Sequence, residues 1–189
     1  TGAFWGLWLC FFIGTVAGLM AIGIASPVGQ EVFLLPAATA AALVGVFAVF
    51  NGVGRPIFGA LVDRIGTQTT AIANLALIAV AALFLWAGSG SGGTAVYVLG
   101  FAALWLCLGG WLAIAPACTA AYCGTRHYGP NYGLVFTAYG VGAIVGNLLA
   151  GTLRDLVGSY TAVFLPVAGL ALLGVAIAAL LLRPPIGTA

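Results

Sequence analysis

The chain contains very little charge and no lysine. Of its 189 residues, five are basic and three are acidic, so that 4% are charged while 63% are apolar. A soluble domain carries about 25% charged residues because its surface must face water. Five basic and three acidic side chains cannot cover the surface of a domain this large. The composition therefore excludes a soluble globular domain and indicates a protein that is surrounded by lipid.

The sequence also lacks the groups that other classes of site require. No stripe of basic residues is present to bind the phosphates of a nucleic acid. The four cysteines have no paired zinc-site spacing, and we expect them to be small core side chains. Gly54-x-x-x-x-Gly59 is not followed by Lys-Ser or Lys-Thr, so it is no phosphate-binding loop. We therefore expect no enzyme activity, metal, cofactor or nucleic-acid partner.

Six apolar runs are long enough to cross a membrane, which takes roughly 20 mostly apolar residues. They cover residues 3–25, 32–61, 69–87, 95–122, 132–153 and 160–182. We expect turns at Gly29-Gln30-Glu31, at residues 88–93 and at residues 124–131, a bend at Pro116, and a stop at Arg183-Pro184-Pro185. The sequence predicts an all-α, polytopic six-helix bundle in a lipid bilayer.

The arginines predict how the bundle is oriented. Six crossings place both termini on the same side of the membrane. If that side is the cytoplasm, the inner loops contain Arg64, Arg126 and Arg183, with Arg55 nearby, whereas the outer loops contain only Arg154. An excess of arginine in cytoplasmic loops is the usual pattern. We therefore predict a multi-pass protein of the cell (inner) membrane with both termini in the cytoplasm.

A short motif recurs at an offset of 92 residues. Gly59-Ala-Leu-Val-Asp63-Arg64-Ile-Gly66-Thr67 matches Gly151-Thr-Leu-Arg-Asp155-Leu-Val-Gly158-Ser159 at both glycines, the leucine and the aspartate. The copies end the second and fifth predicted helices, which run in opposite directions. We interpret this as an inverted repeat of three plus three helices, with residues 1–90 as one copy and 91–189 as the other. The alternative is chance similarity between two glycine-rich helix ends.

Small residues recur within the helices. The chain has 29 glycines, and Gly142 and Gly146 are four residues apart in the fifth run. This spacing places both glycines on one face of the helix. Because they have no side chains, another helix can approach that face closely. The alternatives are plain helix packing and a face that slides during a conformational cycle.

The motif resembles that of a known family. Gly59-x-x-x-Asp63-Arg64-x-Gly66 resembles the loop signature of the major facilitator superfamily, and nearly the whole chain looks like helices seven to twelve, the C-terminal half of the twelve-helix fold. Asn51-Gly-Val-Gly-Arg55-Pro56 and Thr137-Ala138-Tyr139-Gly140 resemble helices eight and eleven of the monocarboxylate transporter and oxalate/formate antiporter group. Two positions depart from the family: Thr67-Gln68 stand where basic residues usually follow, and Tyr139 stands where the antiporter resemblance implies a lysine.

Arg55 is the candidate substrate-binding residue. It precedes Asp63 by eight residues, which places it about 12 Å from the helix end. An arginine at this depth is costly and is a functional hypothesis by default. Its planar guanidinium matches a carboxylate, and the resemblance implies that it holds the carboxylate of the substrate. The alternative is that Arg55 extends to the headgroups or pairs within the protein.

Three further polar residues are candidates for the substrate site. Asn51 lies one turn from Arg55 on the same face and either orients the guanidinium, binds substrate or joins two helices. The resemblance places Tyr139 at the same cavity, with ordinary packing as the alternative. Asn147 occupies the place of Arg55 in the second repeat. One Arg and no Lys favour a substrate with one carboxylate.

The motif residues themselves have a predicted structural role. We expect Asp63 and Arg64, with Gly59 and Gly66, to brace the inner helix ends, and Asp155 to do the same on the outer side. A gating role follows from the family resemblance.

The sequence thus predicts the C-terminal bundle of a secondary active transporter for a small organic anion, such as lactate or formate. Rocking of this bundle against an N-terminal six-helix half would give alternating access, by antiport or symport. Because the chain begins at Thr1, we expect processing or a preceding segment, and the other half comes from such a segment, another chain or a second copy. The alternative is a non-transporting scaffold subunit of a larger membrane complex.

Overall fold

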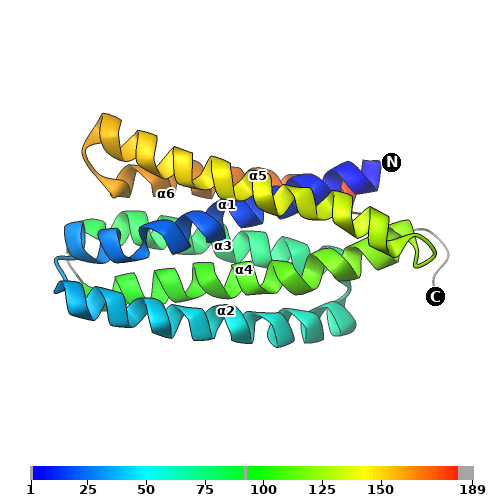
Figure 1. Cartoon of the computed structure of the whole chain (residues 1–189), viewed down its shortest axis with the longest axis horizontal. Coiled ribbons are helices and arrows are strands. Elements are labelled where there is room, and N and C mark those ends of the chain that lie inside the picture. The colour runs from blue at the N-terminus through cyan, green and yellow to red at the C-terminus, as the bar shows by residue number, and fades with distance from the viewer. Residues whose placement is uncertain (1, 92, 183–189) are drawn as a thin grey trace.

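The computed structural model describes residues 2–91 and 93–182, and the described residues form helices and no strands (Figure 1). The six long helices are α1 (Gly2–Glu31), α2 (Ala37–Ile65), α3 (Thr67–Gly88), α4 (Thr94–Cys123), α5 (Tyr128–Val157) and α6 (Phe164–Leu181), with short 3-10 helices η1 (Ser89–Ser91) and η2 (Tyr160–Val163). The predicted all-α bundle is confirmed.

The helices form two layers. In Figure 1 the front layer contains, from top to bottom, α5, α1, α4 and α2. The back layer contains α3 and α6. The principal packing partners are α2 with α4, α5 with α1, and α3 with α6. Exchanging α1, α2 and α3 for α4, α5 and α6 reproduces these pairings, as an inverted repeat requires. The repeat boundaries at residue 90 remain a prediction.

Each of six segments is long and apolar enough to cross a bilayer, the sixth being Tyr160–Leu181, which combines η2 and α6. The chain is therefore an integral, multi-pass membrane protein. The start of α1 and the end of α6 lie at one end of the bundle (Figure 1). We call this the inner end, following the predicted orientation, which itself stays a prediction.

The connection between the first two helices differs from the prediction. The predicted turn at Gly29-Gln30-Glu31 is wrong, because α1 continues through Pro27 to Glu31. The chain leaves the helix afterwards, where Leu34 has a φ of 55°. Pro36 then disfavours helical backbone in the residue before it, so α2 begins at residue 37 and not at residue 32.

The start of α5 also differs from the prediction. The helix begins at Tyr128, so the connection from α4 is shorter than the predicted loop of residues 124–131. Pro130 falls in the first turn, where a proline removes no intrahelical hydrogen bond. The predicted stop at Arg183-Pro184-Pro185 lies outside the described residues.

The two motif copies end their helices in the same way. Gly66 follows α2 with a φ of 81°, and Gly158 follows α5 with a φ of 77°. Each backbone N–H donates to the carbonyl four residues earlier, that of Val62 or Arg154. A side chain is strained at such φ values, so glycine is required to close both helices.

Two glycines at equivalent positions of the two repeat copies allow the backbones of neighbouring helices to approach closely. Gly54 on α2 faces the backbone of Leu106 and Gly110 on α4, and Gly146 on α5 faces the backbone of Val16 on α1. The difference 146 − 54 gives 92, the offset of the motif copies. Close approach of this kind allows van der Waals packing between helices in lipid, where the hydrophobic effect does not drive association. The predicted role of Gly146 as a helix-packing residue is confirmed.

A methyl group at residue 146 tests this packing. In Gly146→Ala the new carbon would lie 2.5 Å from the Val16 carbonyl oxygen. We expect a loss of about 1–3 kcal/mol in stability, as for overpacking in a core. Gly140→Ala is the matched control on the same helix, since a side-chain carbon there meets nothing within 4 Å. Its stability is expected to stay equal or rise slightly.

The measurement is thermal unfolding followed with a fluorogenic thiol reagent. Cys10, Cys107 and Cys118 are buried and become reactive only when the bundle opens. Equal unfolding temperatures for the two variants would show that the Gly146 contact does not hold α5 to α1.

Candidate functional site

Arg55 lies on the exposed side of α2 that faces away from α3. The preceding residue, Gly54, faces α4, whereas Phe50 lines a groove together with side chains of α3 and α4. Arg55 follows Phe50 by five positions and is therefore about 140° around the helix from it. The Arg55 side chain is exposed and makes no hydrogen bond or ion pair to any other residue that the structure describes. The guanidinium is thus open to a ligand or to a partner.

Asn51 joins α2 to α4. Its Nδ2 donates a hydrogen bond to the main-chain carbonyl oxygen of Trp105 at 3.2 Å. The side chain is half-buried, and its carbonyl oxygen is left as an acceptor. The predicted alternative of an interhelical hydrogen bond is therefore what the geometry shows, one helical turn from Arg55.

Tyr139 belongs to a row of aromatic rings on α5. Its ring stacks on Phe136 with centroids 5.1 Å apart, and it lies 6.2 Å from the ring of Phe11 on α1. Tyr132 continues the row, 5.7 Å from Phe136. Phe136 was not among the predicted site residues. Its position three residues before Tyr139 was the available signal, because residues three apart share a helix face.

Asn147 makes a local contact. Its Nδ2 donates to the carbonyl oxygen of Ala143, one turn earlier on α5, at 2.8 Å. The side chain is exposed, and its oxygen lies over Gly23 of α1, where a side chain would collide with it. Unlike Asn51, Asn147 therefore donates its amide hydrogen bond within its own helix and not to a second one.

The four candidates lie in the middle parts of α2 and α5 but in two separate pairs. Arg55 precedes Ile65 by ten residues, about 15 Å from the inner end of α2, and Tyr139 follows Tyr128 by eleven residues, about 17 Å from the inner end of α5. α1 and α4 lie between the two helices (Figure 1). Among the described residues no hydrogen bond or ring contact links Arg55 to Tyr139 or Asn147. The candidates thus occupy two edges of one helix layer.

The tryptophans of α4 pack inside the bundle. Trp111 is fully buried against Gly14 and Phe11 of α1, and Trp105 is 5% exposed beside Phe47 of α2. Both indole nitrogens are buried and have no hydrogen-bond partner within the described parts of the chain. Each indole N–H is therefore a hydrogen-bond donor without an acceptor in the described residues.

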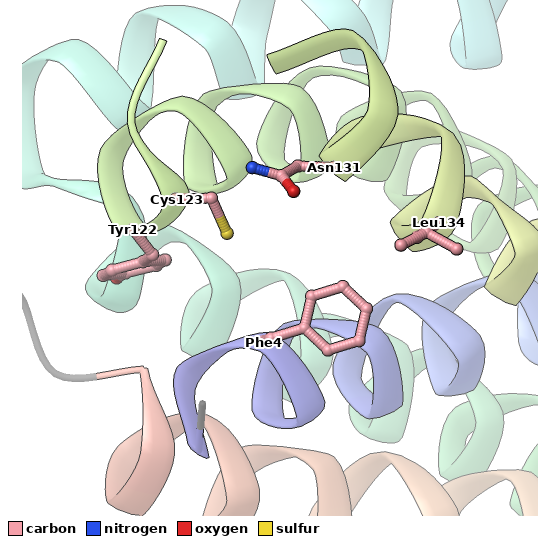
Figure 2. Close-up of a pocket in the computed structure, with 5 residues that line it drawn as sticks. All are labelled: Phe4, Tyr122, Cys123, Asn131 and Leu134. Atoms are coloured by element: carbon pink, nitrogen blue, oxygen red, sulfur yellow. The ribbon is translucent and has the colours of Figure 1, made fainter. Parts of the chain in front are cut away.

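A pocket of about 460 Å³ opens at the inner end of the bundle. Figure 2 shows its five lining side chains around one space: Phe4 of α1, Tyr122 and Cys123 of α4, and Asn131 and Leu134 of α5. The Tyr122 hydroxyl is already bonded, to Thr67 at 2.8 Å and to the Leu182 carbonyl at 3.0 Å. The lining carries an amide and a thiol but no charge, so it does not supply a counter-charge for an anion.

The charged motif residues have no partners within the described segments. Asp63, Arg64 and Asp155 are exposed and make no hydrogen bond or ion pair there. Their predicted bracing role therefore requires a partner outside these segments, and it stays a prediction. No group of three or more His, Cys, Asp or Glu side chains is arranged to hold a metal ion among the residues described.

An ion pair that the sequence reading missed joins the outer ends of α1 and α5. Arg154 lies 3.3 Å from Glu31 and 5.8 Å from the centre of the Tyr160 ring. Both charged side chains are more than 40% exposed, so the pair contributes about 0–1 kcal/mol. The available signal was that six crossings place both charges on the same side.

The Asn51 hydrogen bond can be tested by truncation. Asn51→Ala removes the donor to α4, and we expect a loss of about 0.6–1.5 kcal/mol in stability. Asn147→Ala is the control on the symmetric helix and should cost less, because its amide bonds only within α5. Unfolding temperatures of both variants provide the measurement, and equal losses would contradict an interhelical role for Asn51.

Comparison with known proteins identifies the family. The profile of the Major Facilitator Superfamily matches residues 2–188. An oxalate:formate antiporter of Oxalobacter formigenes is 28% identical over 162 residues, which cover 86% of this chain and 38% of that protein. Apicoplast pyruvate carrier 1 of Toxoplasma gondii is 32% identical over 138 residues, 70% of this chain and 25% of that protein. The chain thus spans well under half the length of these curated relatives. It belongs to the Major Facilitator Superfamily.

Proposed function

We propose that the chain forms one six-helix bundle of a secondary active transporter for a small organic anion, and that Arg55 binds the carboxylate. The observation that carries the proposal is a guanidinium about 15 Å from the inner helix end with no partner in the described residues. A cation at this depth is retained at a cost and calls for a counter-charge. An organic anion in a central cavity supplies that charge.

The surroundings of Arg55 favour a monocarboxylate. Among the described basic residues, Arg55 is the one that lies more than two turns from both ends of its helix. At a matching depth on α5, Tyr139 and Phe136 present aromatic rings, which offer apolar surface and one hydroxyl. One fork-shaped cation fits one carboxylate. The named substrates of the two relatives, oxalate, formate and pyruvate, are small carboxylates and support a small organic anion; formate and pyruvate carry one carboxylate, whereas oxalate carries two.

The exposed edges of the bundle support a two-bundle carrier. α2 and α5 expose most of their surface, and Arg55, Asn51, Tyr139 and Asn147 lie on them. A second six-helix half packed against this layer would enclose the anion at mid-membrane. Rocking of the two halves would then give alternating access, as either antiport or symport.

Uptake of labelled formate or lactate tests the role of Arg55. The assay uses proteoliposomes that contain the chain together with its six-helix partner. Arg55→Ala removes the cation that the proposal pairs with the carboxylate of the anion. Loss of such a charge partner costs about 2–5 kcal/mol of binding free energy, which lowers the affinity for the anion at least about 30-fold. We expect uptake to be lost, while Arg126→Ala, an exposed arginine of the α4–α5 connection, keeps it.

Normal uptake by Arg55→Ala would rule out the assigned role. Absence of uptake by the unaltered chain with its partner, together with no anion-dependent stabilisation, would favour the scaffold alternative.

Competition distinguishes one carboxylate from two. Unlabelled formate, lactate and pyruvate should each inhibit uptake, whereas oxalate should inhibit at least about tenfold less well, because its second charge would face aromatic rings and not a cation. The measurement is the inhibitor concentration that halves uptake. Equal inhibition by oxalate would show that a second cation, contributed from elsewhere, completes the site.

A further inference from the structure

A second pocket lies on α2, close to its inner end. Its volume is about 270 Å³, and it is lined by Ile57, Ala60, Leu61 and Arg64. Arg64 is exposed and makes no hydrogen bond or ion pair with any other described residue. The pocket therefore combines three apolar side chains with one free guanidinium.

The pocket extends from the apolar interior to the membrane surface. Arg64 follows Ile57 by seven residues, so the two lie about 10 Å apart along the helix axis. Ile57, Ala60 and Leu61 belong to the apolar span of α2, and Arg64 lies in its last turn. At this depth apolar side chains are covered by lipid or protein, whereas the guanidinium reaches the headgroups.

This pocket is separate from the candidate anion site. Ile57 follows Arg55 by two positions and so points about 160° away from it around the helix. The pocket lies on the flank of α2 opposite to Arg55. Its occupant is therefore not the transported anion.

The equivalent row on α5 lacks the cation. At the offset of 92 residues, Arg64 corresponds to Leu156, and Ile57 and Leu61 correspond to Leu149 and Leu153. Leu156 is 77% exposed. Two of the three apolar positions thus recur on the other half of the repeat, with Thr152 in the place of Ala60, and this row carries its charge at the inner end. Of the two rows, the one on α2 therefore combines apolar side chains with a cation, a lining that fits a ligand with an apolar body and an anionic group.

We propose that the pocket binds an anionic phospholipid, with the headgroup phosphate on Arg64 and the start of one acyl chain against Ile57, Ala60 and Leu61. A guanidinium matches two phosphate oxygens with parallel N–H donors. Basic residues at the cytoplasmic ends of transmembrane helices attract anionic lipid through the same charge complementarity. The pocket is smaller than a phospholipid, so it holds only the part of the lipid next to the headgroup.

Retention of lipid by the purified chain tests the proposal. The chain is extracted from membranes with equal amounts of phosphatidylglycerol and phosphatidylcholine, and bound lipid is quantified by native mass spectrometry. We expect the unaltered chain to retain phosphatidylglycerol preferentially. Arg64→Gln should reduce that preference about tenfold. Arg126→Gln is the matched control: an exposed arginine near the same end of the bundle that lines no described pocket, and it should leave the preference unchanged.

A second variant separates the apolar part of the pocket from the charge. Ala60→Trp fills the space between Ile57 and Arg64 while leaving the guanidinium in place, and it should reduce retention as Arg64→Gln does. Inorganic phosphate, added as a competitor, should not displace the lipid, because it lacks the acyl chain.

Three outcomes would overturn the assignment. An equal loss in Arg64→Gln and Arg126→Gln would mean that any basic residue at this end attracts the lipid. Full retention by Ala60→Trp would mean that the apolar pocket is not used, and displacement by phosphate would mean an anion site without a lipid chain. Each outcome is independent of whether Arg55 binds a transported anion, which the uptake assay measures separately.

Discussion

Helices in a bilayer gain no hydrophobic energy by associating, so the bundle depends on how closely their backbones approach. Gly54 and Gly146 provide this approach at equivalent places, one against α4 and the other against α1. The contacts fix α2 and α5 at the two edges of the front layer. Most other features follow from this placement, because both edge helices keep a face that no other helix of the chain covers.

The two polar side chains of α2 near this uncovered face differ in their partners. Asn51 satisfies part of its amide through the Trp105 carbonyl and thereby stabilises the α2–α4 pair. Arg55, one turn further, is left without a partner in the described residues. A buried pairing would have neutralised the charge within the bundle. The guanidinium is instead held at the edge of the layer, where our proposal assigns its counter-charge to a transported anion.

The sequence predicted those features that a single helix determines. The six spans, and the motif glycines Gly66 and Gly158 that end two of them, depend on apolar composition and on local backbone conformation. The turn at Gly29-Gln30-Glu31 was wrong because a helix within a bundle tolerates Pro27 when its neighbours pack around it. The partner of Asn51 and the ring contacts of Phe136 depend on which helices meet, and no periodicity in the sequence specifies that. The roles of Arg55 and Tyr139 in binding remain predictions.

The pairing of helices has a consequence for how the protein is made. Each glycine contact joins one helix from each half of the repeat, α2 to α4 and α1 to α5. Chains insert into the membrane from the N-terminus onward, so when α2 leaves the ribosome its principal neighbour has not been synthesised. Helices α1, α2 and α3 must therefore wait in the bilayer, with the Gly54 face of α2 uncovered, until α4 arrives. Assembly is therefore interleaved, and neither triplet of helices is a unit that matures alone.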